Sequence, residues 1–327
     1  MTRVLSGIQP TGDIHLGNYL GAIRNWVADQ HEHDAYYCVV DLHALTIAPT
    51  AEELRAKTLQ TAQVLLAAGL DPDVCTLFVQ SHIPEHTELS WLLECTATFG
   101  ELRRMTQFKD KSEGRESVPV GLFTYPVLQA ADILIYDADR VPVGEDQRQH
   151  LELCRDIAIR FNHRYGDTFV VPDAGIPKMG ARIQDLQEPT RKMSKSADSP
   201  QGTVLVLDSP DAIRRKLKRA VTDPYKSVRY DPEHKPGVSN LLTILAVASG
   251  DGVEALAERY SEYGPLKQDT AEALIEYLAP VRERYAELEA DPAGTAALLA
   301  LGAEKAQAVA TATLARAKAA VGLLERG

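Results

Sequence analysis

The chain of 327 residues has little of what membrane-spanning and exported proteins depend on. Aromatic residues make up only 6% of it, and no apolar run reaches the roughly 18 residues that a spanning helix needs. The first residues lack the apolar core of a secretory signal peptide. These absences argue against a membrane protein and against export, and we expect a cytoplasmic protein that contacts no membrane.

The cysteines show none of the spacing of a disulfide framework or a zinc site. Cys38, Cys75, Cys95 and Cys154 are far apart, form no Cys-x-x-Cys pair and stand in apolar stretches. This pattern is typical of buried free thiols in a reducing compartment. The histidines also lack zinc-ligand spacing, and neither a catalytic triad nor a pair of glycosidase-type carboxylates is evident. We therefore expect no metal site built from protein ligands.

The net charge of −11 argues against broad, nonspecific binding of nucleic acid, because such binding needs a basic domain. Basic residues nevertheless cluster in three places, at 103–104, at 109–115 and at 214–219. Each cluster is a candidate contact for nucleic acid. Taken singly, each is better explained as a solvated helix face.

The first ~190 residues alternate strand and helix patterns at the spacing of βαβ units. Strands are expected at 3–6, 35–40, 76–80 and 140–143, and the second and third are apolar runs typical of strands buried on both faces. Leu16, Leu20, Ile23 and Val27 form one apolar helix face, and another helix ends at Gly69. The pattern predicts an α/β fold with a doubly wound, mostly parallel, Rossmann-like sheet. Such sheets bind ligands outside the carboxyl ends of their strands.

The composition changes near Pro189, and after Asp208 every pattern is helical. Ser209 is a candidate N-cap with Pro210 at the first helical position. The last stretch, 295–325, is rich in alanine and without aromatic residues. We predict a catalytic domain over 1–190 and a smaller all-helical domain over 191–292, with a helix at about 293–327 packing back on the first domain.

Two motifs are suited to phosphate. The first, Ser6-Gly7-Ile8-Gln9-Pro10-Thr11-Gly12-Asp13-Ile14-His15-Leu16-Gly17-Asn18, follows the first strand and opens a helix, whose N-terminal N–H groups and dipole favour an anion. His15 adds a hydrogen-bond donor nearby. The second motif, Lys192-Met193-Ser194-Lys195-Ser196, has two lysines that can wrap a triphosphate and neutralise a pyrophosphate leaving group. In isolation, an ordinary turn and a surface loop explain them as well.

Two further motifs carry carboxylates. Asp146, in Val143-Gly144-Glu145-Asp146-Gln147, lies between a strand and a helix, where it either caps the helix or accepts bonds from ribose hydroxyls or an ammonium group. Tyr125, Gln129 and Asp132 share one face of a predicted helix. Asp132 has apolar neighbours, so its carboxylate needs a hydrogen-bond donor. That donor is either a ligand or a group of the protein's own backbone.

In this order the motifs resemble the signatures of class I aminoacyl-tRNA synthetases. The first is similar to the "HIGH" signature and the second to an intact "KMSKS" signature. Segments 7–12, 40–46, 104–111 and 142–147 are similar to the bacterial tryptophanyl branch, and the resemblance covers nearly the whole chain. Two positions depart from the pattern: Asn18 replaces the final His of the first signature, as is usual in the tryptophanyl branch, and Gln129 stands where many tryptophanyl enzymes carry Met.

The resemblance implies ATP-dependent activation of L-tryptophan and its transfer to tRNA(Trp). It assigns catalysis to Gln9, His15, Lys192 and Lys195. It implies an ATP pocket drawn from both signatures and the 144–146 loop, namely Gln9, Pro10, Thr11, Gly17, Asn18, Gly144, Glu145, Asp146, Ile183, Lys192, Met193, Ser194, Lys195 and Ser196. The residues implied for tryptophan are Gly7, His43, Tyr125, Gln129, Asp132 and Gln147. Mg²⁺ would arrive with ATP, and the family forms homodimers in which the anticodon of the tRNA reaches the helical domain.

Three alternatives stay open. Tyr125, Gln129 and Asp132 also match the amino-acid-binding helix of tyrosyl-tRNA synthetases, although the 144–147 loop lacks the usual Gly-Gly start of that branch. A nucleotidyltransferase of the same superfamily would share the first signature, but such chains are usually shorter. A non-catalytic RNA-binding paralogue would tolerate loss of Lys192, Lys195 or Asp146, and all three are present.

Overall fold

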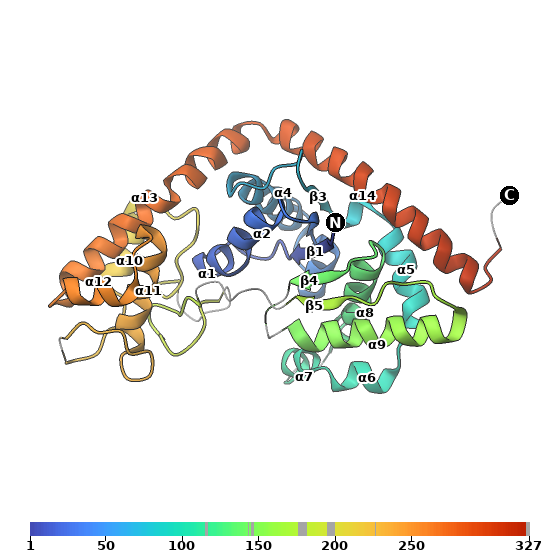
Figure 1. Ribbon diagram of the computed structural model, residues 1–327, viewed down its shortest axis with the longest axis horizontal. Coiled ribbons are helices and arrows are strands. Elements are labelled where there is room, and N and C mark those ends of the chain that lie inside the picture. Colours follow the sequence, from blue (N-terminus) through green and yellow to red (C-terminus); the bar gives the residue numbers. More distant parts are fainter. Residues whose placement is uncertain are drawn as a thin grey trace.

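The computed structural model describes residues 1–114, 117–142, 144, 147–175, 182–194, 200–225 and 227–324. Within these ranges five parallel strands form one sheet at the centre of the fold, in the order β3-β2-β1-β4-β5 (Figure 1). The strands are β1 (Arg3–Ile8), β2 (Asp34–Val39), β3 (Thr76–Val79), β4 (Arg140–Pro142) and β5 (Asp173–Gly175). The first strand pairs along its whole length with β2, from Arg3 opposite Asp34 to Ile8 opposite Val39.

The sheet confirms the predicted α/β class and its parallel, doubly wound arrangement. Four strands lie where the sequence predicts them, within one residue at each end except for β1, which runs two residues further. Position 143, the predicted end of the fourth strand, lies outside the described residues. The fifth strand was missed because its residues, Asp173-Ala174-Gly175, are all types that are depleted in strands.

Side chains of each strand alternate between two apolar cores, one on each face of the sheet. Val4, Tyr37 and Val39 face the core that includes the first helical segment and α4, whereas Leu5 and Cys38 face the core under α5, α8 and α9. The helices of the α/β part are α1 (Leu16–Asn18), the π-helical η1 (Tyr19–Ile23), α2 (Arg24–Asp29), α3 (Asp41–Ala44), the 3₁₀ turn η2 (Leu45–Ile47), α4 (Ala51–Ala67), the 3₁₀ turn η3 (Gln80–His82), α5 (Glu85–Glu94), α6 (Phe99–Arg104), α7 (Thr106–Ser112), α8 (Val120–Leu134) and α9 (Arg148–Tyr165).

The second half of the described chain is helical, as predicted. Its helices are α10 (Pro210–Lys218), α11 (Pro236–Ser249), α12 (Val253–Arg259), α13 (Tyr263–Ala290) and α14 (Pro292–Ala320). Ser209 is the N-cap of α10, because its hydroxyl accepts the N–H of Ala212 and Pro210 opens the helix. This confirms the predicted start of that helix.

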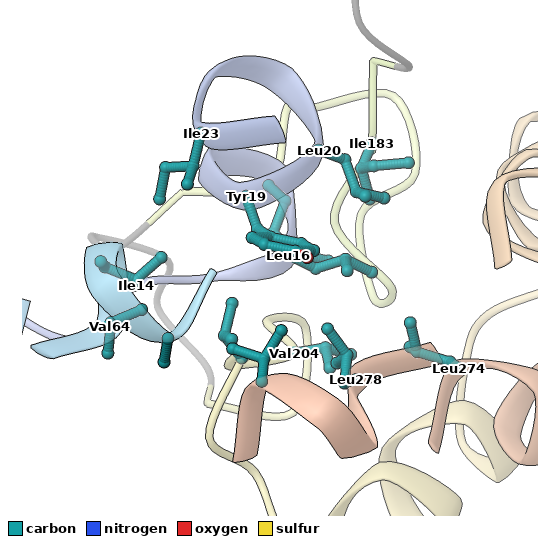
Figure 2. Close-up of a cluster of buried hydrophobic side chains, with 14 of the residues drawn as sticks. Ile14, Leu16, Tyr19, Leu20, Ile23, Val64, Ile183, Val204, Leu274 and Leu278 are labelled. Atoms are coloured by element: carbon teal, nitrogen blue, oxygen red, sulfur yellow. The ribbon is translucent and has the colours of Figure 1, made fainter. Parts of the chain in front are cut away.

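One apolar core joins the helical region to the sheet. Figure 2 shows Leu16 and Leu20 of the first helical segment beside Ile183 and Val204, with Leu274 and Leu278 of α13 completing the cluster. The backbone is tied as well, since the N–H of Leu16 donates to the carbonyl of Val204 at 2.8 Å and that of Val206 to Ile14 at 2.9 Å. The core continues through this region without a break, and the packing does not mark a boundary. The predicted domain boundary near residue 190 stays a prediction.

The helix α14 covers the β3 edge of the sheet, which parallel sheets otherwise leave open to pairing with another chain. It begins where α13 ends and runs along the sheet, away from the helices α10, α11 and α12 (Figure 1). The contact is close because Gly302 lies against the backbone of Leu77 in β3, and a Cβ built on Gly302 would overlap the Leu77 carbonyl oxygen. Ion pairs from Arg316 to Asp137 and from Lys318 to Glu88 hold the last turns.

Two other expectations from the sequence are settled by burial and ion pairing. All four cysteines are free, but only Cys38, Cys75 and Cys154 are buried; Cys95 is exposed, because it caps the C-terminal end of α5 at the surface. The prediction for Cys95 was therefore wrong.

In the basic cluster on α10, Arg214 pairs with Glu272 and Asp211, and the buried Lys216 pairs with Asp208 at 2.6 Å. These pairs occupy two of the five basic side chains of the cluster.

Across the described ranges, no single helix is long and apolar enough to cross a membrane. The helices α11 and α12 reach that length only when taken together, and the chain bends by 110° between them.

Replacing Gly302 with Ala tests the packing of α14 on β3. The added methyl group would collide with the Leu77 carbonyl, so we expect Gly302→Ala to lower the free energy of unfolding by roughly 1–3 kcal/mol in a urea titration. The control is Gly264→Ala in α13, where an added Cβ meets nothing within 4 Å. We expect it to be neutral or to stabilise by up to about 1 kcal/mol. Equal stability of the two variants would contradict the described contact.

Candidate active site

The candidate site lies where β1, β2 and β3 end at the same edge of the sheet. Gly7 is near the end of β1, His43 follows β2 in α3, and Gln80 follows β3 in η3. A Cβ at Gly7 would stand only 3.0 Å from Cγ1 of Val40, so a side chain at this position would press on Val40. The edge is the one where ligands bind in doubly wound sheets.

A single carboxylate organises this edge. Asp132 of α8 is only 4% exposed and is bonded to three side chains from three other elements. Its Oδ1 accepts from Gln80 Nε2 at 2.7 Å and from His86 Nδ1 at 2.6 Å, and its Oδ2 accepts from His43 Nε2 at 2.8 Å. Gln80 is itself fixed, because its Oε1 accepts the N–H of Leu42 at 3.1 Å. The alternative of a bond to backbone is therefore wrong, because side chains supply all three donors.

These bonds keep Asp132 ionised. Burial on its own raises the pKa of the carboxyl group, but the charge and hydrogen bonds of His43 and the hydrogen bond of His86 outweigh it and hold the pKa well below that of an exposed aspartate. An ionised carboxylate only accepts hydrogen bonds, so His43 carries a proton on Nε2 and His86 carries one on Nδ1. Of the roughly four acceptor positions of a carboxylate, one on Oδ2 is left for a further donor.

Tyr125 lies two helical turns before Asp132 on α8 and faces the same site. Its ring stands edge-on to His43, with the ring centroids 6.2 Å apart. Its hydroxyl donates to Gln107 Oε1 at 3.2 Å and accepts from His150 Nε2 at 2.8 Å. Burial raises the pKa of Tyr125 to about 12, so the hydroxyl stays protonated at neutral pH. Gln129, between the two residues on α8, is half-buried.

The first signature forms a short capped helix start. His15 is the N-cap of α1, and its Nδ1 accepts the N–H of Asn18 at 3.2 Å while Asn18 Oδ1 accepts the N–H of His15 at 3.5 Å. Because Nδ1 accepts the N–H of Asn18, the hydrogen bond assigns the ring proton to Nε2. A Cβ at Gly17 would stand 3.0 Å from the His15 ring, so a larger residue here would press on the N-cap histidine. Gln9, Pro10 and Thr11 follow β1 in the loop before this helix.

The second signature packs directly against the first. Met193 is 1% exposed, and its Cβ would lie 3.6 Å from a Cβ at Gly17. The N–H of Met193 donates to the carbonyl of Ile183 at 3.1 Å, and Lys192 is bridged to Gln184. The side chain of Ile183, to which the resemblance assigns an adenine contact, is 1% exposed and faces the core, and that contact stays a prediction.

The remaining predicted residues are placed only in part. Lys192 is exposed, and the carbonyl of Ser194 accepts the hydroxyl of Thr203 at 3.2 Å. Gly144 is exposed, and its carbonyl accepts the N–H of Gln147, the N-cap of α9. Four predicted site residues lie outside the described residues: Glu145, Asp146, Lys195 and Ser196.

The structure thus brings Gly7, His43, Tyr125 and Asp132 to one place, and adds Gln80 and His86, which the sequence analysis missed. Gln80 could have been found, because it is the last residue of a predicted strand and so lies at the sheet's carboxyl edge. His86 gave no such signal. Its partners are 46 and 50 positions further along the chain, so only the folded structure brings them together.

Comparison with known proteins gives the family of this site. A family model described as "tRNA synthetases class I (W and Y)" matches residues 1–279. The chain belongs to the class I tRNA synthetases. Among curated relatives of this synthetase, a protein of Streptomyces avermitilis named tryptophan–tRNA ligase 2 is 58% identical over 327 residues, which covers 98% of this chain and 97% of that one.

Solved structures of synthetases agree with the fold. The tryptophanyl-tRNA synthetase of Mycoplasma pneumoniae superposes with a TM-score of 0.91 at 35% identity, covering 99% of this chain and 98% of that one. The tryptophanyl-tRNA synthetase of Campylobacter jejuni, solved in complex with ADP and tryptophan, gives a TM-score of 0.87 at 35% identity and covers 98% of this chain and 100% of that one.

Converting Asp132 to Asn tests whether the carboxylate holds the cluster together. The amide keeps the shape of the carboxyl group, but its NH2 group would face a side chain that now donates to an Asp132 oxygen. We therefore expect Asp132→Asn to lower the free energy of unfolding by about 1–3 kcal/mol in a urea titration. The control is Asp211→Asn, whose side chain is 88% exposed and pairs only with Arg214 among the contacts described. It should change stability by less than about 0.5 kcal/mol. An unchanged Asp132→Asn variant would contradict the bonded cluster.

Proposed function

We propose that this synthetase activates L-tryptophan with ATP and transfers the tryptophanyl group to tRNA(Trp). The observation that carries the proposal is the buried, ionised carboxylate of Asp132, which has one acceptor position left at the ligand-binding edge of the sheet. A buried acceptor of this kind needs an N–H or O–H donor from its ligand. The indole N–H of tryptophan is such a donor, and relatives that match over the full chain are named tryptophan–tRNA ligases.

The amino acid would lie between α8 and the ends of β1 and β2. Gly7 leaves room for the ring, His43 borders it, and Asp132 accepts the indole N–H. We assign Tyr125 and Gln147 to the α-amino group. Gln129, half-buried on the same helix, would face the ring where other members of the branch carry Met.

ATP would lie across the two signatures, which the contact of Met193 with Gly17 places side by side. We assign the nucleotide to Gln9, Pro10, Thr11, Gly17, Asn18, Gly144, Glu145, Asp146, Ile183, Lys192, Met193, Ser194, Lys195 and Ser196. We assign His15, the N-cap of α1, to a phosphate oxygen of ATP.

The chemistry needs no protein nucleophile. The carboxylate of the amino acid attacks the α-phosphate of ATP and pyrophosphate leaves; a terminal ribose hydroxyl of the tRNA then attacks the aminoacyl adenylate and AMP leaves. Catalysis consists of positioning and of stabilising charge on the leaving pyrophosphate. Gln9, His15, Lys192 and Lys195 would do this.

Mg²⁺ would enter with ATP. In the part of the chain that the structure describes, no group of three or more His, Cys, Asp or Glu residues is placed to hold a metal ion. The donor set therefore does not fit a metal held by the protein alone, and none of the steps above runs through one.

The proposed assembly is a cytoplasmic homodimer. Trp91 on α5, Phe99 on α6 and Val120 on α8 are each at least 66% exposed, and these helices are neighbours, with α8 in contact with both of the others. Large apolar side chains gathered at one place usually mark an interface. We assign them to the contact with a second copy, and we assign the anticodon of the tRNA to the helical region.

ATP–pyrophosphate exchange with single amino acids tests the substrate. We expect exchange with tryptophan and none with tyrosine above background, since the chain follows the tryptophanyl branch outside the 125–132 segment. The measurement is incorporation of labelled pyrophosphate into ATP. Tyrosine-dependent exchange that exceeds the tryptophan signal would favour the tyrosyl alternative instead.

Lys195→Ala tests the second signature. If the Lys195 ammonium contacts the triphosphate as the leaving group gains charge, its removal should cost about 3–4 kcal/mol, a factor of a few hundred in the single-turnover rate of adenylate formation. Tryptophan affinity, measured by calorimetry, should change little. The control is Lys218→Ala, an exposed lysine on α10, which should leave the rate unchanged. If both variants form adenylate at the wild-type rate, Lys195 has no catalytic role.

A further inference from the structure

Behind Asp132 lies a second layer of polar side chains to which the reaction chemistry assigns no role. His86 of α5 is fully buried, and both of its ring nitrogens are bonded: Nδ1 to Asp132 Oδ1 at 2.6 Å and Nε2 to the hydroxyl of Tyr136 at 2.7 Å. Tyr136, just after α8, is also fully buried. Its ring stacks on Tyr36 at 5.1 Å and stands edge-on to Phe78 at 5.4 Å, so the hydroxyl is held in place.

The direction of the hydrogen bonds follows from the two ends of this chain of groups. Asp132 is ionised and can only accept, so His86 donates from Nδ1. Burial raises the pKa of the Tyr136 phenol far above that of an exposed tyrosine, so Tyr136 stays protonated. In the tautomer with its ring proton on Nδ1, His86 accepts the Tyr136 hydroxyl at Nε2. The three groups form one directed hydrogen-bond chain, from Tyr136 through His86 to Asp132.

This chain determines which oxygen meets the ligand. Gln80 and His86 together occupy Oδ1, while Oδ2 has only His43 and keeps one acceptor position. Without the His86 donor, Oδ1 would keep one bond, and the carboxylate would lose both a charge-stabilising donor and a restraint on its rotation. An acceptor that is fixed and ionised rejects a ligand lacking a donor at that point, because the buried oxygen would be left without a partner.

We propose that His86 and Tyr136 are positioning residues for substrate specificity: they hold Asp132 so that the site selects an amino acid whose ring carries an N–H group. The inference rests on the proposed function. It assigns neither residue to contact with substrate. Both act through Asp132 on the discrimination between tryptophan and an isostere without the N–H.

The test compares tryptophan with 3-(3-benzothienyl)-L-alanine, in which sulfur replaces the indole N–H. In ATP–pyrophosphate exchange, the wild-type ratio of kcat/KM for tryptophan to that for the isostere should be at least about a hundredfold. Tyr136→Phe removes only the hydroxyl and should reduce this ratio about fivefold. It should do so by raising KM for tryptophan, with KM for ATP unchanged. His86→Leu should reduce the ratio about tenfold or more, and His86→Asn, which keeps a donor near Nδ1, should restore part of it.

Tyr37→Phe is the matched control. Tyr37 is 1% exposed, and its hydroxyl donates to the carbonyl of Trp26 at 2.9 Å in the core on the other face of the sheet. It should lower the melting temperature about as much as Tyr136→Phe and leave the ratio at its wild-type value. If His86→Leu does not fold, Tyr136→Phe decides alone.

Two results would contradict the inference, and they differ. A wild type without tryptophan-dependent exchange overturns the proposed function and this inference with it. An active wild type whose ratio is unchanged by Tyr136→Phe, with a melting temperature lowered as in the control, overturns only this inference and leaves the two residues with a structural role.

Discussion

Burying one carboxylate sets the main constraint on this site. An ionised aspartate that is 4% exposed is tolerated only with donors around it, and here they come from η3, α3 and α5, which are separate in sequence. Such a cluster adds little net stability compared with apolar packing. What it provides is a fixed acceptor at the carboxyl edge of the sheet, and the specificity that we propose follows from that acceptor.

The nucleotide side of the site depends on a different constraint, which is close apolar packing. Gly17 and Met193 bring the two signatures into contact, and the backbone bonds between Ile14, Leu16, Val204 and Val206 tie the segment after the second signature to the start of α1. The same core continues into α13 (Figure 2). A movement of the helical region would therefore be transmitted to the residues assigned to ATP.

Local patterns predicted the elements well and the polar cluster poorly. Apolar runs placed β1 to β4, and Ser209 with Pro210 placed the start of α10, because strand burial and helix capping depend on neighbours in sequence. No such local signal marks three other features: the strand β5, the exposure of Cys95 and the π-helical turn at 19–23. Asp132 was recognised by its apolar neighbours. Its partners Gln80 and His86, and Tyr136 behind them, meet only through long-range folding.

In the proposed complex, Asp132 presents one open acceptor position on Oδ2 to the substrate. A crystal structure of the full chain with L-tryptophan and a non-hydrolysable ATP analogue tests it most directly. The account predicts the indole nitrogen within about 2.7–3.2 Å of Asp132 Oδ2, with His43, Gln80 and His86 still bonded to the carboxylate. An indole nitrogen bonded elsewhere, or a carboxylate that turns away from His86 when tryptophan binds, would contradict it.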